Sequence, residues 1–267
     1  MKPYKSKGPI SPSKLLVLQF LLLLVVEFLR PLRNPTEARG PRILRNFVIA
    51  GLGSITMIFV QKPLVDALYR KMDKKNWGVV RSMRLPRWAS TIASILLLDY
   101  SLYLWHVLTH RLPLLWRFHQ VHHIDKDLDA STALRFHFGE LLLSVPWRLL
   151  QICLIGPSRK SFQLWQSLLM SSVLFHHSNI RLAPRIERLV AWLIMTPSLH
   201  GIHHSQRKDE MDTNWSSGLT LWDRLHGTFK GKSLKAEVDI GVEGYSGPHT
   251  LIPVLRLPFS KKHKVGA

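Results

Sequence analysis

Residues 96–123 read LLLDYSLYLWHVLTHRLPLLWRFHQVHH, an apolar run that ends in a dense group of histidines. Positions four apart share one face of a helix, so His106 and His110 project together, and Asp99 and Tyr103 lie on the same stripe. The stretch therefore predicts an apolar helix whose end presents paired imidazoles.

The H-x-x-H-H spacing of residues 119–123 occurs a second time at residues 200–204. A single pair of spaced histidines is weak evidence of a metal site, because most such histidines are ordinary surface or core residues. Here ten of the fourteen histidines lie in or near these stretches, and burying that many unpartnered imidazoles would be costly. One four-coordinate zinc would leave most of them unused, which favours two metal ions. The ten are His106, His110, His119, His122, His123, His137, His177, His200, His203 and His204.

Cys153 is the only cysteine, so a cysteine-based zinc cluster and an intramolecular disulfide are both excluded. Neutral imidazole suits iron, zinc, copper and nickel, and its second nitrogen usually needs an acceptor that fixes the tautomer. The alternative for any such acceptor is a solvated side chain or a helix cap. The candidates are Asp99, Tyr103, Asp125, Glu140, Asn179 and Asp223.

Apolar residues make up 46% of the chain and are clumped in five runs, each too continuous for a soluble amphipathic helix. Several runs fall short of the ~20 residues that comfortably span a bilayer, so partial crossings and hairpins are expected. We predict an all-α fold: an integral membrane helical bundle of hairpins with a cytoplasmic histidine-rich helical cap. The runs are residues 15–29, 46–60, 89–108, 141–156 and 161–178.

The formal charge is +20, from 37 Lys and Arg against 17 Asp and Glu, and the excess is spread along the whole chain. Such a spread suits a membrane surface with anionic lipids as well as it suits nucleic acid, and the apolar runs favour the membrane. We expect no nucleic-acid partner. Seven tryptophans are expected to anchor the chain at the membrane interface: Trp105, Trp116, Trp147, Trp165, Trp192, Trp215 and Trp222.

The order of the apolar runs predicts on which side of the membrane the histidines lie. If the fourth and fifth runs turn at GPSRKS, residues 156–161, all the histidines emerge on one side of the membrane. We expect the cytoplasmic side, although residues 61–87 with eight Lys and Arg then face the opposite side, against the positive-inside tendency. Three regions are predicted: residues 1–88 with N-terminal membrane helices and a basic connecting loop, residues 89–235 with the histidine boxes, and residues 236–267 as a basic tail.

The chain resembles the fatty acid hydroxylase/sterol desaturase superfamily of membrane di-iron enzymes in residues 96–142 and in the later segments FHHSNIRL, TPSLHGIHHS and LTLWDRLHGTF. The similarity runs from about residue 90 to residue 230, and the boxes in this order are a specific signature. The resemblance implies a histidine-ligated centre of two iron ions that uses O2 and external electrons to hydroxylate or desaturate a lipid. Oxidising an unactivated C–H bond needs a redox-active metal, which a d10 zinc ion is not.

Carried across residue by residue, the resemblance makes all ten histidines metal ligands. Its H-x-N element selects His177 over His176, and the histidine of LRFH falls on His137. The chain departs from the family's pattern at Val107, Phe138 and His226 without losing a ligand. The boxes are His106 and His110, then His119, His122 and His123, then His200, His203 and His204.

The substrate stays open among sterol, fatty acyl, sphingoid and carotenoid lipids, because ordinary apolar side chains would line the channel. No cytochrome b5-like or ferredoxin-like segment is visible, so a separate electron donor is expected: a cytochrome b5-like protein, a ferredoxin or a reductase. The alternative function is a histidine-rich membrane metal transporter or metal-binding protein. A transporter would hold its ligands near the membrane midplane, whereas these boxes lie at helix ends. Residues 199–230 are expected to close over the metals.

Overall fold

The computed structural model describes residues 11–231, 238–245, 247 and 249–260. Those residues form helices and loops and no strand, apart from three isolated bridges between residue pairs. The predicted all-α class is confirmed. The helices are α1 (Pro12–Leu29), α2 (Arg39–Thr56), α3 (Lys62–Lys75), α4 (Val79–Ser82), α5 (Arg87–Arg111), α6 (Pro113–His123), α7 (Phe138–Ile155), α8 (Arg159–His177), α9 (Pro184–Ala191), α10 (Pro197–His203), α11 (Lys208–Met211), α12 (Leu221–Leu225) and α13 (Leu251–Arg256).

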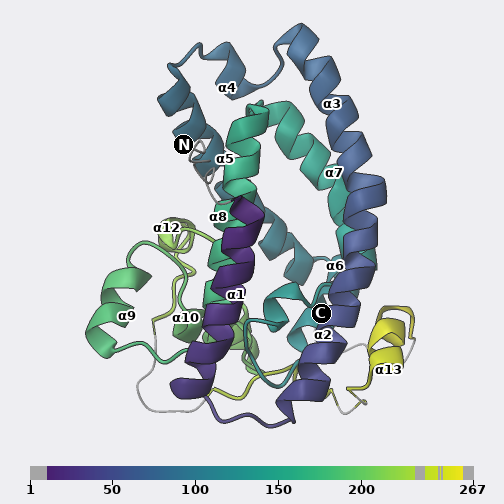
Figure 1. The fold of residues 1–267 in the computed structure, drawn as a ribbon, viewed down its shortest axis with the longest axis vertical. Helices are drawn as coiled ribbons and strands as arrows, with labels where there is room; N and C mark the ends of the chain where they lie inside the picture. The colour runs from purple at the N-terminus through teal and green to yellow at the C-terminus, as the bar shows by residue number, and fades with distance from the viewer. Residues whose placement is uncertain (1–10, 232–237, 246, 248, 261–267) are drawn as a thin grey trace, which may run out of the picture.

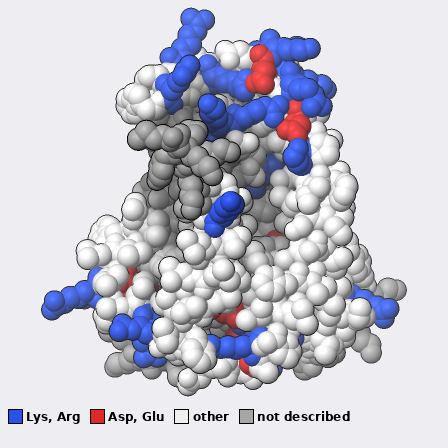
Figure 2. All heavy atoms as spheres, in the orientation of Figure 1, with Lys and Arg blue, Asp and Glu red and all other residues white. Residues whose placement is uncertain are grey.

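Four helical stretches among the described residues are long and apolar enough to cross a membrane: Pro12–Leu29, Arg39–Ser82, Arg87–Arg111 and Phe138–Ile155. Their outer faces expose large apolar side chains, as lipid-facing helices do. Figure 2 shows Lys and Arg gathered at the two ends of the molecule, with a broad middle that is nearly free of charge. The fifth apolar run forms α8, which is not one of the four.

The second of these stretches is longer than its apolar run. α2 continues through a π-helical turn at Met57–Gln61 into α3, and Pro63, which has no N–H to donate, follows directly. α3 ends at Asn76, whose left-handed φ of 52° closes the helix. Residues 62–75, predicted as part of a basic connecting loop, are therefore helical. Their last lysines stand at the negative end of the helix dipole, where cations are favourable.

α7 and α8 form the predicted hairpin, which turns at the end of the molecule away from the histidines (Figure 1). Gly156 ends α7 with a φ of 70°, which glycine adopts without strain. The turn packs backbone against backbone on Gly78, where an added Cβ would overlap Gly156. The hairpin brings the start of α7 and the end of α8 to the same side, where the histidines need to meet.

A buried ion cluster connects α2 to the loop that follows α6, in the histidine-bearing end of the molecule, which we call the cap. Arg42 donates to Asp125 Oδ2 at 3.0 Å and also binds Asp129. Arg135 donates to the carbonyl of Val121 in α6 at 2.8 Å. A buried guanidinium needs such partners, because an unpaired charge in the interior is strongly unfavourable.

The predicted C-terminal tail is partly folded onto the cap. α13 and the 3-10 turn after it place Val254 and Leu257 in one buried cluster with Ile49, Trp116 and Val121. These contacts pack residues 254 and 257 of the predicted tail against the histidine-bearing region. The basic end of the tail, residues 261–267, lies outside the described residues.

Candidate metal centre

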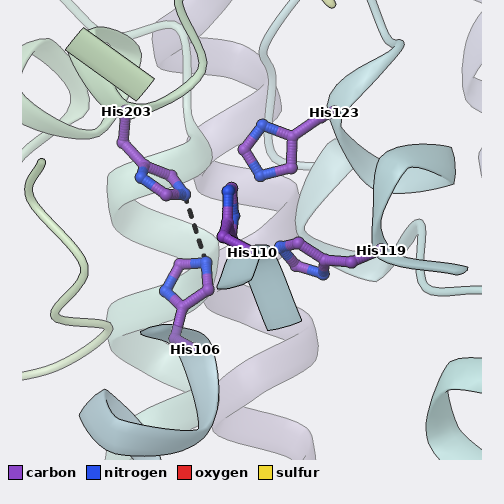
Figure 3. Close-up of side chains that lie close together, drawn as sticks. All are labelled: His106, His110, His119, His123 and His203. Atoms are coloured by element: carbon purple, nitrogen blue, oxygen red, sulfur yellow. Dashed lines mark hydrogen bonds between the residues drawn. The ribbon is translucent and has the colours of Figure 1, made fainter. Parts of the chain in front are cut away.

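Nine of the ten predicted histidines meet where the end of α5, α6, the end of α8 and the short α10 come together. They form two clusters, and within each cluster the possible ligand nitrogens lie within 4.8 Å of one another. The rings of the first cluster face a common space in Figure 3. Cluster A comprises His106, His110, His119, His123 and His203, and cluster B comprises His122, His177, His200 and His204.

Each H-x-x-H-H box serves both clusters. In α6, His119 and His123 lie four positions apart and belong to cluster A, while His122 belongs to cluster B. The third box reverses the arrangement, with only its middle histidine in cluster A. The ring centroids of His123 and His204 are 4.2 Å apart, so the boxes meet directly and residues 199–204 do close over the site. The doubled histidine lets one short helix supply two adjacent sites.

Ring nitrogens in cluster A show that it suits a cation. His106 Nδ1 donates to the carbonyl of Trp215 at 2.6 Å, and His203 Nδ1 donates to the carbonyl of Thr213 at 2.9 Å. A neutral imidazole carries a single proton, so both Nε2 atoms, 3.1 Å apart (Figure 3), bear lone pairs. Facing lone pairs repel each other, and a metal ion would turn that repulsion into coordination.

Cluster B repeats the arrangement. His177 Nδ1 donates to the carbonyl of Val173 at 2.9 Å, which leaves its Nε2 as a lone pair. That atom lies 3.0 Å from Nε2 of His122 and 3.0 Å from Nε2 of His200. Burial lowers the pKa of His177 to about 4, and burial likewise lowers the pKa of His203 in cluster A to about 3. Both rings are therefore neutral at physiological pH and available as ligands.

Other ring nitrogens are buried without any hydrogen-bond partner among the described residues. Both nitrogens of His110, both nitrogens of His123 and Nε2 of His119 are in this state. An unsatisfied buried polar group costs about 1–3 kcal/mol, so a native interior rarely keeps several side by side. Coordination would satisfy one nitrogen of each ring, and the donor set thus fits two metal ions with nitrogen ligands.

Glu140 is the predicted outer partner that does contact a histidine. Its Oε1 accepts the Nδ1–H of His119 at 2.8 Å, from the first turn of α7. The other five candidates do not contact a histidine of either cluster through a hydrogen bond that the structure shows, because they hold loops and helix ends instead. Asp99 accepts from Leu219 and Trp222, Asp125 from Arg42, Asn179 from Arg33, and Asp223 from Trp215 and Ser216, while Tyr103 bonds with Thr228.

Three carbonyl partners and two aromatic walls of the site were not expected from the sequence. A backbone carbonyl has no residue identity, so nothing in the sequence marks those of positions 173, 213 and 215. Trp116 and Trp215 are buried, with ring centroids 4.8 and 4.6 Å from that of His110. Trp165 is buried in a core cluster near the far end. The prediction that these three tryptophans anchor the membrane interface is therefore wrong.

His137 lies in neither cluster. Its Nδ1 accepts the backbone N–H of Gly139 at 2.9 Å and caps α7, and its Nε2 donates to the carbonyl of Leu255 at 3.2 Å. With both nitrogens engaged, this ring ties the C-terminal segment to the cap and offers no free lone pair to a metal. His176, the neighbour passed over in favour of His177, is buried with its ring centroid 4.1 Å from that of His200.

Comparison with known proteins shows which family the chain belongs to. The fatty acid hydroxylase family matches residues 91–228, slightly more than half of the sequence. The chain belongs to the fatty acid hydroxylase family. Both histidine clusters lie wholly within the matched residues of this fatty acid hydroxylase family member.

Three relatives of this family member are lipid-modifying enzymes by name. An ornithine lipid hydroxylase of Rhizobium tropici is 31% identical over 172 residues, covering 64% of this chain and 50% of that protein. An alkylglycerol monooxygenase of Xenopus tropicalis is 30% identical over 189 residues, covering 67% of this chain and 40% of that protein. A cholesterol 25-hydroxylase of Mus musculus is 27% identical over 143 residues, covering 52% and 46%. The matched segment thus spans half or less of each relative, and no solved structure matches the chain.

Proposed function

We propose that the protein is an O2-dependent di-iron oxidoreductase that hydroxylates a C–H bond of a lipid. The observation that carries the proposal is the pair of facing clusters, five and four buried imidazoles, in a member of the fatty acid hydroxylase family. The relatives are named as hydroxylases and monooxygenases, which favours hydroxylation over desaturation.

Each cluster would hold one iron ion. Iron with O2 supplies the oxidising chemistry that an unactivated C–H bond requires. Four groups hold the imidazole protons on Nδ1 and so direct the Nε2 lone pairs inward: the carboxylate of Glu140 and the carbonyls of Val173, Thr213 and Trp215.

Aromatic rings exclude water from cluster A. Trp116 and Trp215 are only 4% and 1% exposed, and both pack against His110. A dry site favours reaction with the lipid over side reactions with solvent. The lipid would come from the membrane, because the clusters lie at one end of the candidate membrane-spanning helix α5, and the electrons would come from a separate donor. We place the histidines on the cytoplasmic face, where iron and electrons are supplied.

Metal analysis of the purified protein tests this proposal. We expect two irons per chain in the wild type. His204→Ala removes a cluster B ligand and should lower the iron content and abolish lipid oxidation, because ligands act as a unit. His249→Ala, outside both clusters, is the matched control and should keep the iron. One zinc with no iron would contradict the proposal, as would full iron content in His204→Ala.

A further inference from the structure

A large cavity lies in the cap outside the two histidine clusters. Its volume is about 1240 Å³, and its walls come from the segment between α1 and α2, from α9, from the start of α10 and from residues 229–231 and 238–240. Asn179, Leu199 and Gln206 of the wall each lie within two positions of a cluster B histidine. The cavity therefore borders the backbone that carries cluster B.

Cationic side chains outnumber carboxylates in the wall of this cavity. Seven cationic side chains line it, and only Arg42 among them has a carboxylate within 4.0 Å in the part of the chain that the structure describes. Five carboxylates also line the cavity, so its wall carries an excess of two positive charges, which a bound anion would neutralise. The six cations that remain are Arg33, Arg39, Lys126, Arg181, Arg188 and Arg224.

Most carboxylates of the wall are engaged with other groups. Asp127 accepts the backbone N–H groups of Thr36 and Glu37 at 2.8 and 2.9 Å. Glu187 accepts the hydroxyls of Thr196 and Ser198. Glu27 and Asp129 are similarly engaged, by backbone N–H groups and by Arg42, and Asp239 is exposed. These hydrogen bonds leave the carboxylates charged but hold them in place, and none of the five forms an ion pair with the other six cations among the described residues.

Arg33 connects the cavity to the third histidine box. Its Nη2 donates to the carbonyl of Pro197 at 3.3 Å, and its Nη1 is buried without a hydrogen-bond partner among the described residues. Its guanidinium packs on Gly201, where an added Cβ would overlap it. Burial lowers the pKa of Arg33 to about 10, so the group stays charged at physiological pH. An unpaired buried N–H donor at this place suits an anionic acceptor.

An apolar rim adjoins the cations. Trp192 lines the cavity and is 71% exposed, and Leu189 and Leu193 next to it are 73% and 65% exposed. Arg224 stands against this rim, 4.5 Å from the ring centroid of Trp192 and 3.8 Å from that of Phe229. Figure 1 shows α9 at the edge of the molecule, away from the helix bundle. Cations beside exposed apolar side chains are complementary to an anionic amphiphile rather than to a small anion.

We propose that this cavity binds the anionic headgroup, a phosphate or carboxylate, of the lipid substrate, while the lipid's hydrocarbon lies along the apolar rim of α9. That the bound lipid is the substrate rests on the proposed function, but the binding of an anionic lipid does not depend on it. It names a charged lipid class and a place for its polar end, next to cluster B.

Binding measurements on the purified full-length protein test this inference. Titration calorimetry measures the binding of three probes: dihexanoyl phosphatidylglycerol, uncharged dihexanoylglycerol and inorganic phosphate. The test variant is Lys126→Gln with Arg188→Gln, two exposed wall cations with no hydrogen bond or ion pair that the structure shows. The control is Arg185→Gln with Lys208→Gln, two exposed cations outside the wall with the same change of charge.

We expect the wild type to bind the anionic lipid about tenfold or more tightly than the uncharged lipid, and the test variant to lose about tenfold in affinity for the anionic lipid alone. The control should bind both lipids as the wild type does. Equal loss in the control would overturn the inference, and so would equal affinity for the charged and uncharged lipids. Phosphate bound as tightly as the lipid would mean a free-anion site. If the test variant binds the lipids as the wild type does but accepts electrons more slowly, the cavity is a docking face for an acidic protein, and the inference is overturned.

The proposed function fails separately from this inference. A protein that binds anionic lipid selectively but contains no iron would keep the cavity inference and refute the di-iron proposal. A protein with two irons that oxidises an uncharged lipid equally well in the wild type and the test variant would do the reverse.

Discussion

Glu140 differs from every other proton acceptor that the structure shows in the two clusters, because it carries a full negative charge. Its Oε1 is 2.8 Å from Nδ1 of His119, and both side chains are buried. A carboxylate behind an imidazole fixes the tautomer and makes the opposite nitrogen a stronger ligand. At this scale one hydrogen bond governs the ligand strength of one ring in cluster A.

Glu140→Gln is expected to weaken iron binding by about 10–100-fold, the usual effect of removing such an outer partner. The glutamine keeps the size and an acceptor oxygen but loses the charge. Chelator competition would measure the iron affinity, and the spectrum of the bound iron would report the change at His119. Glu243→Gln, an exposed position, is the control. An iron affinity unchanged in Glu140→Gln would refute this role for Glu140.

Among the elements, α5 and the segment at residues 214–222 depend on each other. Asp99 of α5 accepts the backbone N–H of Leu219 at 3.1 Å and the indole N–H of Trp222 at 2.7 Å. The same segment supplies the Trp215 carbonyl that orients His106, which lies on the same face of α5 as Asp99. Asp99 therefore acts through the segment, not on a histidine as first predicted.

Asp99→Ala should loosen that segment, because two N–H donors lose their acceptor, at a cost of about 1–3 kcal/mol for each one left buried and unpaired. Hydrogen exchange measured by mass spectrometry should show faster exchange in residues 214–222. Gly218→Ala should give the same result, since the added Cβ would overlap the Asp99 carboxylate. Asp73→Ala, which removes an exposed ion pair at the far end, is the control. Unchanged exchange in both Asp99→Ala and Gly218→Ala would contradict the coupling.

In the face of the molecule that Figure 2 shows, Lys and Arg gather at two ends, and the middle between them has few charged residues. One end holds the histidine clusters, and the other holds α4 and the basic end of α3 (Figure 1). The positive-inside tendency favours a cytoplasmic α3 end, whereas the supply of iron and electrons favours cytoplasmic histidines. We propose the orientation in which the histidines face the cytoplasm.

Cysteine labelling distinguishes the two orientations. In a Cys153→Ser background, Lys208→Cys marks the histidine end and Lys74→Cys marks the far end, and both positions are exposed. With a membrane-impermeant maleimide on intact cells, we expect labelling of Lys74→Cys only. Lys208→Cys should react after the membrane is permeabilised. The opposite pattern would place the histidines outside the cytoplasm.

The sequence by itself determined the long apolar helices, the histidine boxes and the fact that the histidines share one end of the molecule. These features depend on local periodicity: His106 and His110 lie four apart on one helix, and a hairpin at Gly156 returns His177 to the same end. Glu140 was also within reach, because it stands in the first turn of the helix that follows the boxes.

Only the tertiary structure decided how the histidines divide. His122 and His123 are neighbours in the chain, yet they serve different clusters because successive side chains of a helix point about 100° apart. His137 was excluded by a carbonyl at Leu255, more than a hundred positions away, and the cationic cavity gathers Arg33, Lys126 and Arg188 from three distant segments. Such contacts follow from packing between elements, and backbone carbonyls and remote cations leave no local pattern in a sequence.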